Sequence, residues 1–378
     1  MKRITGFVLV LGLLMIAGGA QAQASPAPLV MLLNGADLWQ SFPAGQYPVR
    51  LTTSGNTDRP YLSPDGVHIA YKVIADIGIE ALKQTGGLVS ELPSDLEVRD
   101  LGARGSLRIV TQPAGATFVA GQPSNAIVRS APAWSPDGRR LAWTEDVSPG
   151  DVRRLMLYDL AGGTSAILAA DMPLQNGFQQ TLPARWGAGG IALLSSTQDP
   201  ANPANPPIET LLIYGDDGKL RASAQSKPAA GEYLYDFEWI DDGGADRLGI
   251  VYSTGRWEVV DPATGAISPL NGVPQLYSTS NPNGLALDFG VTNLPGQGAV
   301  FTWTVVIPGA PSIPLTFTGP IEWITISPVG DSLAYADGGV AYVWRDGQAT
   351  AVNGTNPTDL SAAEMVWGPT AWRSHAPG

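Results

Sequence analysis

Short runs of alternating apolar and polar residues recur along the chain and are separated by compact turn sequences. The clearest unit, at 63–71 and 135–143, is Ser-Pro-Asp-Gly followed by an apolar-Ala-aromatic triplet that starts three residues after the glycine. A variant with valine in place of aspartate occurs at 327–335. Proline fixes the first corner of a turn, aspartate accepts hydrogen bonds from the backbone ahead, and glycine adopts a positive φ. The pattern therefore predicts a tight hairpin between two strands, and it predicts turn roles for Asp65 and Asp137 rather than metal binding.

Weaker copies of the same hairpin extend the count to six. They place a turn before an apolar run at Trp186–Leu193, Trp239–Tyr252 and Asn281–Leu287. Further strands with their own Gly-rich turns lie between the hairpins, at Leu155–Leu160, Leu211–Tyr214, Trp257–Val260 and Ala341–Trp344. Repeats at a period of roughly 40 to 50 residues are typical of propeller blades. Helical periodicity is nearly absent, with Ile79 to Gln84 as the exception.

The two ends of the chain have the composition of half a blade each. Leu29–Leu33, Leu38–Phe42 and Tyr47–Thr52 supply outer strands without an inner one, and Met365–Trp372 supplies an inner strand. Pairing them would close a ring, which leaves only short, protected sheet edges. The sequence thus predicts an all-β fold, a β-propeller of seven blades with one composite blade, and six or eight blades remain open. We expect residues 25–378 to form this single domain.

The first residues have the three parts of a secretory signal peptide. Lys2 and Arg3 form a basic n-region, Phe7–Ala17 is the apolar h-region, and Ala22-Gln23-Ala24 is a small-x-small cleavage site. Cleavage there predicts a mature chain that starts at Ser25, in the periplasm, secreted or at the cell surface. The alternative is an uncleaved membrane anchor, because this stretch is nearly long enough to span a bilayer.

Charge and cysteine content narrow the partners and the chemistry. The chain has 22 basic and 34 acidic residues, so removing Lys2 and Arg3 leaves a net charge of 20 − 34 = −14. Such a protein repels nucleic acid. The absence of cysteine excludes disulfides, thiolate metal sites and a cysteine nucleophile. No second apolar run has the length of a transmembrane helix, so we expect no membrane span in the mature chain.

The pattern Arg50-Leu51-Thr52, a short spacer, and then Pro60 to Tyr71 resembles the repeat of the TolB propeller and of related WD-repeat-like propellers. It is also similar to the propellers that precede the catalytic domain of prolyl-oligopeptidase-like peptidases. The resemblance implies the fold and an envelope or extracellular location. TolB carries an α/β domain ahead of its propeller and the peptidases carry a hydrolase domain, and neither is expected here.

Candidate catalytic and metal-binding residues are few. A serine hydrolase needs a Gly-x-Ser-x-Gly elbow with a histidine, but the chain has no such elbow and only His68 and His375. We expect His68 to be a solvated strand residue. We assign no catalytic residue, no metal ligand and no cofactor, with calcium as the alternative in the acidic turns Asp216-Asp217-Gly218, Asp241-Asp242-Gly243 and Asp246.

Tryptophan is abundant, with 11 residues, which raises the question of sugar stacking. Trp134, Trp186, Trp239 and Trp367 occupy the same position before a turn, and Trp143 lies in the following strand. A repeated position predicts packing between blades. Trp39, Trp257, Trp303 and Trp344 are left unassigned.

Long connections are concentrated at one type of position. If strands are lettered A to D from the axis outward, the long segments are the B–C connections Asp76–Ser94, Glu145–Arg153 and Gln198–Ile208, and the D–A connection Gln112–Ser130. These connections emerge on one face of a propeller, and insertions on one face commonly mark a binding surface. The candidate binding residues are Glu80, Glu91, Asp146, Asp151 and Asp199.

Two classes of function follow from this chemistry. The leading hypothesis is an exported, non-enzymatic binding or scaffold protein that engages a protein or glycan partner through the face with the long connections. The alternative is a carboxylate-dependent enzyme, a lyase or a glycoside hydrolase, with its site in the central funnel. Buried, converging carboxylates in the funnel would favour the enzyme.

Overall fold

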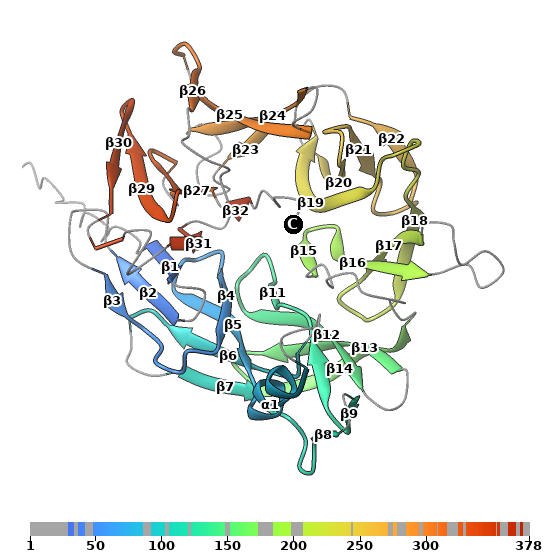
Figure 1. The fold of residues 1–378 in the computed structure, drawn as a ribbon. Helices are drawn as coiled ribbons and strands as arrows, with labels where there is room; N and C mark the ends of the chain where they lie inside the picture. Colours follow the sequence, from blue (N-terminus) through green and yellow to red (C-terminus); the bar gives the residue numbers. More distant parts are fainter. Residues whose placement is uncertain are drawn as a thin grey trace, which may run out of the picture.

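The described strands of the computed structural model form seven blades in a ring, which is a β-propeller (Figure 1). The structure describes residues 29–33, 37–41, 48–85, 92–102, 106–119, 122–147, 152–172, 184–197, 207–242, 245–270, 275–277, 285–294, 298–307, 309–315, 324–327, 330–352, 354–355, 362–367 and 371–372. The expected seven blades and the composite blade are both confirmed. The predicted signal peptide and its cleavage site lie outside the described residues.

Each blade is an antiparallel sheet with its first repeat strand, A, nearest the axis. Blade 1 contains β31 (Ala362–Val366), β1 (Leu29–Leu33), β2 (Asp37–Ser41) and β3 (Val49–Arg50). Blade 2 contains β4 (Thr57–Leu62), β5 (His68–Ile74), β6 (Ser94–Asp100) and β7 (Ser106–Val110). In blade 3 the A strand is split into β10 (Ile127–Arg129) and β11 (Ala133–Trp134), followed by β12 (Arg140–Val147), β13 (Val152–Asp159) and β14 (Thr164–Met172).

The remaining blades repeat this order. Blade 4 contains β15 (Arg185–Gly187), β16 (Gly190–Thr197), β17 (Ile208–Tyr214) and β18 (Leu220–Gln225). Blade 5 contains β19 (Leu234–Asp242), β20 (Ala245–Tyr252), β21 (Trp257–Val260) and β22 (Ile267–Pro269). Blade 6 contains β23 (Gln275–Tyr277), β24 (Ala286–Leu294), β25 (Gly298–Val306) and β26 (Ile313–Leu315). Blade 7 contains β27 (Ile324–Ile326), β28 (Leu333–Asp337), β29 (Val340–Arg345) and β30 (Gln348–Ala351).

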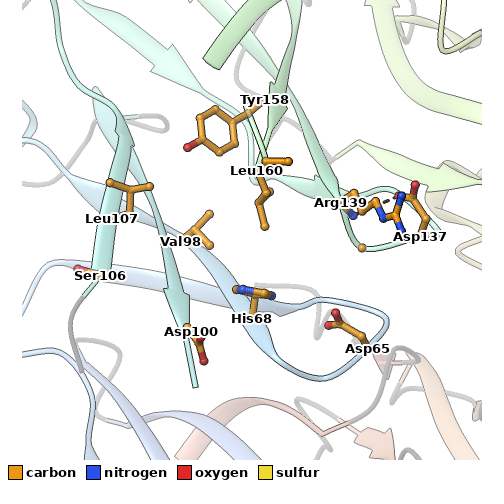
Figure 2. A pocket seen from close by; sticks show the side chains of 12 residues that line it. Asp65, His68, Val98, Asp100, Ser106, Leu107, Asp137, Arg139, Tyr158 and Leu160 are labelled. Carbon is orange, nitrogen blue, oxygen red and sulfur yellow. Dashed lines mark hydrogen bonds between the residues drawn. The ribbon is translucent and has the colours of Figure 1, made fainter. Parts of the chain in front are cut away.

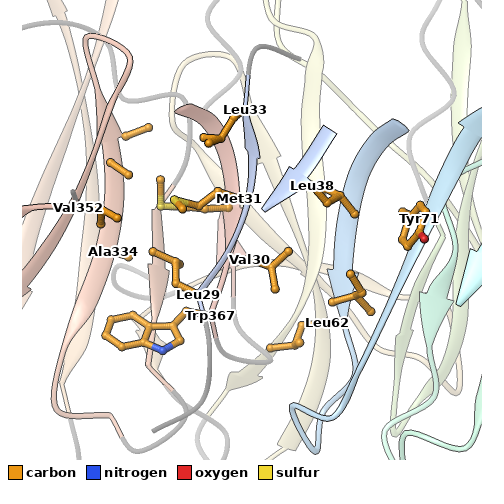
Figure 3. Packing of buried hydrophobic residues seen from close by; sticks show 14 of the residues in the cluster. Leu29, Val30, Met31, Leu33, Leu38, Leu62, Tyr71, Ala334, Val352 and Trp367 are labelled. Atoms are coloured by element: carbon orange, nitrogen blue, oxygen red, sulfur yellow. The ribbon is translucent and has the colours of Figure 1, made fainter. Parts of the chain in front are cut away.

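Closure of the ring joins the two ends of the chain, as expected, but with different strand bounds. The inner strand of blade 1 is β31, which ends at Val366 and pairs with β1. The expectation of a single inner strand over Met365–Trp372 is wrong, because β32 (Ala371–Trp372) pairs instead with β27 of blade 7. Apolar side chains of β1, Met31 among them, pack between blade 1 and its neighbours (Figure 3). Met31, and Met365 of β31, are fully buried.

The Ser-Pro-Asp-Gly turns have the geometry that their sequence predicts. In blade 2, Ser63 Oγ donates to Asp65 Oδ1, and the Val67 backbone N–H donates to the same oxygen at 3.0 Å. The same contacts recur at Asp137 in blade 3. Gly66 and Gly138 have φ values of 72° and 69°, which favour glycine. The prediction that these aspartates are turn residues is confirmed.

Tryptophans connect neighbouring blades, also as expected. The indole N–H of Trp134 donates to the Tyr61 carbonyl of blade 2 at 2.7 Å, and that of Trp239 donates to the Arg185 carbonyl of blade 4 at 3.1 Å. The guanidinium of Arg140 stacks on the ring of Trp186. The unassigned tryptophans Trp257, Trp303 and Trp344 are buried and Trp39 is half-buried, so they too belong to the packing.

The alternation of strands gives the ring two different faces. The turn face carries the A–B and C–D turns, among them the Ser-Pro-Asp-Gly turns of blades 2 and 3. The helix face carries the B–C and D–A connections and the one helix in the described part of the chain, α1 (Asp76–Thr85). This helix contains the predicted helical stretch Ile79 to Gln84. It contacts β8 (Thr117–Val119), which pairs with β9 (Gln122–Ser124) in the D–A connection (Figure 1).

Candidate functional site

The helix face has a packed structure where blades 2 and 3 meet. The Ala75 backbone N–H donates to the Pro93 carbonyl at 3.1 Å, and Pro93 forms an antiparallel bridge with Val128 of blade 3. Gly78 and Ala81 are the buried residues of α1, and a Cβ at Gly78 would lie 2.7 Å from the Pro93 carbonyl oxygen. The small residues thus let the helix pack directly against the segment before β6, which bridges to blade 3.

The predicted binding residues are only partly brought together. Glu80 is exposed on α1, where it accepts a hydrogen bond from Gln84 and lies 3.9 Å from the Lys83 ammonium. Asp146 lies at the helix-face end of β12 and pairs with both Nε and Nη2 of Arg153, at 2.7 and 3.0 Å. Glu91, Asp151 and Asp199 lie outside the described residues. Of the two that are described, Glu80 is thus the more accessible to a partner.

A buried charge network joins blades 2 and 3 below this surface. Arg129 is 3% exposed, and its Nε donates to Glu145 Oε1 at 2.8 Å, while Nη2 donates to the Thr111 carbonyl at 3.0 Å. Arg154 pairs with the same carboxylate. Burial raises the pKa of Glu145, but the Arg129 charge and these hydrogen bonds more than offset it, so the pKa is lowered. This network could not be predicted from the sequence, because its only signal would be a lone arginine in an inner strand.

A second charged cluster lies at the inner edges of blades 4 and 5, where the A strands surround the axis. Arg185 on β15 lies 2.8 Å from Glu238 Oε2 and 3.5 Å from Asp236 Oδ1, both on β19. Tyr61 of blade 2 also interacts electrostatically with Arg185. Burial raises the pKa of Glu238, the Arg185 charge opposes this rise, and Asp236 adds to it. The two carboxylates converge on one guanidinium, which neutralises part of their charge.

At the acidic turns considered for calcium, the described carboxylates of Asp216, Asp217 and Asp246 have partners within the protein. Asp216 pairs with Arg140 of blade 3 at 2.6 Å, and Asp217 Oδ1 accepts a hydrogen bond from the Lys219 backbone N–H. Asp246 Oδ2 accepts one from the Gly189 backbone N–H. Asp241 and Asp242 lie in β19, and Gly243 is outside the described residues. Within the described ranges, no group of three or more histidine or carboxylate side chains is arranged to hold a metal ion.

The turn face has a pocket between blades 2 and 3, with a volume of about 870 Å³. Its lining comes from the A–B turns and outer strands of both blades: Asp65, His68, Val98, Asp100, Ser106, Leu107, Asp137, Gly138, Arg139, Tyr158, Leu160 and Ala161. His68 lies between Asp65 and Asp100, below the apolar side chains (Figure 2). The expected solvated strand residue is therefore part of a pocket wall. The other histidine, His375, lies outside the described residues.

Comparison with known proteins gives likenesses of fold. No family model and no curated protein sequence matches the chain. Among solved structures, TolB from Acinetobacter baumannii is similar over 91% of this chain and 66% of its own, with 15% identity and a TM-score of 0.43. An oligogalacturonate lyase from Vibrio parahaemolyticus is similar over 80% of each chain, with 13% identity and a TM-score of 0.45.

A third similar structure is the β-propeller domain of the Trilobed protease from Pyrococcus furiosus, which covers 82% of this chain and 84% of its own, with 12% identity and a TM-score of 0.44. This chain spans just under two thirds of the TolB chain.

No helix in the described part of the chain has the length and apolar character needed to cross a membrane. The assignment of the fold as a β-propeller rests on the seven blades described above.

Proposed function

We propose that this protein is an exported, non-enzymatic binding or scaffold propeller of the cell envelope or exterior, with repeats of the TolB type. It engages a protein or glycan partner through the helix face. The observation that carries the proposal is the packing of α1 against the β8–β9 hairpin, which we call the ledge. The ledge lies where blades 2 and 3 are bridged by Pro93 and Val128. A connection that was merely tolerated would not need buried small residues and a bridge to the next blade.

The outer side of the ledge has the chemistry of an interface rim. Glu80, Lys83 and Gln84 are exposed on consecutive turns of α1, while Ile77, Ile79 and Leu82 are half-buried beneath them. Mixed charges around partly buried apolar residues are typical of the edge of a protein interface. The three exposed side chains make no contribution to the core, so they can be removed without unfolding the blade.

The test uses a triple variant and a matched control. Glu80→Ala, Lys83→Ala and Gln84→Ala remove the exposed side chains of α1 and keep a good helix former at each position. The control removes an acid, a lysine and a glutamine that are exposed on the turn face of blades 4 and 7, in the variant Asp217→Ala, Lys219→Ala and Gln348→Ala. Partners captured by the wild-type protein from the native envelope are identified by mass spectrometry, and glycans are tested on an array. We expect the α1 variant to lose the partner and the control to keep it; equal capture by both would refute the helix face.

Export has its own test. If the signal peptide is cleaved after Ala24, the intact mass of the exported protein corresponds to a chain that starts at Ser25. A mature protein that retains Met1 or Lys2 would support a membrane anchor instead. Cleavage would also agree with residues 25–378 as a single propeller domain.

The cluster of Arg185, Asp236 and Glu238 favours one alternative, a carboxylate-dependent lyase or glycoside hydrolase. A carboxyl with a raised pKa, such as that of Glu238, can serve as a general acid. The alternative predicts that the protein cleaves a polysaccharide and that Glu238→Gln abolishes cleavage, as measured by the release of reducing ends. Absence of cleavage across acidic and neutral polysaccharides would remove the alternative.

A further inference from the structure

We propose that the pocket on the turn face is a second binding site, which takes a peptide segment with an apolar side chain flanked by lysine or arginine. This site lies opposite the helix face and is independent of the partner proposed there. Two observations carry the proposal: the size and apolar walls of the pocket, and the charge of its rim.

The size and walls of the pocket suit an apolar side chain. Its volume of about 870 Å³ falls within the range of roughly 300 to 1,000 Å³ for small-ligand pockets. Val98, Tyr158 and Leu160 line one part of it, and Leu107, which is 58% exposed, lies at its outer edge (Figure 2). Burial of an apolar side chain against these residues would remove their surface from water, which favours binding.

The rim of the pocket is negatively charged. Its lining includes three carboxylates, Asp65, Asp100 and Asp137, and one guanidinium, that of Arg139. In each aspartate, Oδ1 accepts a hydrogen bond from a turn N–H, while Oδ2 has no partner among the described residues. The hydrogen bond from Ser135 lowers the pKa of Asp137, which keeps it ionised at neutral pH. The carboxylates are thus held by their turns with one oxygen each available to a cation.

Substitution of the three aspartates by asparagine tests the charge of the rim without breaking the turns. Asparagine keeps Oδ1 as an acceptor and removes the charge. The control replaces three other turn aspartates, Asp217, Asp261 and Asp346, with asparagine, which changes the net charge by the same amount. The probes are the fluorescein-labelled peptides Gly-Lys-Phe-Lys-Gly, the same peptide with glutamate in place of lysine, and the same peptide with alanine in place of phenylalanine.

We expect the Lys-Phe-Lys peptide to bind the wild-type protein and the control triple equally in fluorescence polarisation. The pocket triple should bind it about tenfold more weakly, which corresponds to three exposed charge interactions. The glutamate peptide should not bind. Leu107→Gln should weaken binding of the phenylalanine peptide more than that of the alanine peptide, whereas Leu220→Gln, a change at a similarly exposed leucine of blade 4, should do neither.

Two results would overturn the proposal. One is the absence of saturable binding of the Lys-Phe-Lys peptide to the wild-type protein up to about 1 mM. The other is equal weakening by the two aspartate triples, because binding would then follow overall charge and not the pocket. Neither result affects the helix face, whose test uses different residues and a different readout.

Discussion

The two faces of the propeller are built by different rules. On the turn face, the same serine and aspartate contacts recur in blades 2 and 3, and in blade 7 Asp331 takes the place of the missing aspartate by accepting from Ser327. On the helix face, the connections of the same region differ: a helix joins β5 to β6 within blade 2, and a hairpin lies between β7 of blade 2 and β10 of blade 3. The repeat thus specifies one face, while the other is free to vary. The variation is concentrated on the helix face, where the repeated turn sequence is not required. This is the face that we propose binds the partner.

The largest expected effect is on the free energy of unfolding, and it distinguishes the buried charge network of the helix face from an exposed ion pair on the turn face. Arg129→Met removes one of the two positive charges that pair with the buried Glu145 carboxylate. We therefore expect a loss of about 3 to 5 kcal/mol in the free energy of unfolding. Arg345→Met makes the same change on the turn face, where Arg345 is 54% exposed and pairs with Asp331. We expect at most about 1 kcal/mol there. Equal losses in urea unfolding would mean that the helix-face network does not join the blades.

An intermediate effect is expected at the turns. Gly138 has a φ of 69°, a conformation that β-branched residues rarely adopt. Gly138→Val should lower the free energy of unfolding by about 1 to 3 kcal/mol, and Gly66→Val should do the same. Gly138→Asn is the matched control, because asparagine tolerates this conformation, and it should cost less. If thermal unfolding were the same for valine and asparagine, the turn face would not depend on its glycines.

A smaller effect depends on pH and belongs to the helix face of blade 5. Hydrogen bonds from Arg256, and from Thr254 and the Ala229 N–H, lower the pKa of Glu232 from 4.5 to about 2. Because the pKa is depressed in the folded state, the stabilisation is present above pH 4.5 and is lost as the pH falls toward 2. Glu232→Gln should cost about 1 to 2 kcal/mol at pH 7 after allowance for solvent screening. Urea unfolding at pH 7 and pH 2 should show the difference shrink, and a constant difference would contradict the ion pair.

The sequence predicted the local structure wherever a residue type has one structural role, such as glycine at a positive φ in a turn. The Ser-Pro-Asp-Gly turns, the repeated position of Trp134 and Trp239, and the helical stretch from Ile79 could each be read from neighbouring residues. The split of the A strand of blade 3 and the separate pairing of β32 could not, because both depend on the adjacent strands.

The candidate sites were harder to predict than the fold. The pocket combines Asp65 of one blade with Tyr158 of the next, residues far apart in sequence whose approach depends on how the blades pack. The sequence predicts His68 to be a solvated strand residue, because the residues around it in its own strand do not reveal that side chains of blade 3 lie beside it. The Arg129 network has the same origin, since its partners come from β6, β12 and the D–A connection.

The central claim, that the helix face and not the axis of the ring binds the partner, is tested most directly by hydrogen–deuterium exchange of the protein with and without the captured partner. We predict slower exchange in residues 76–85 of α1 and in residues 111–119 of the D–A connection, with the inner strands β15 and β19 unchanged. Slower exchange confined to β15 and β19, around Arg185 and Glu238, would contradict the claim and favour a site in the central funnel.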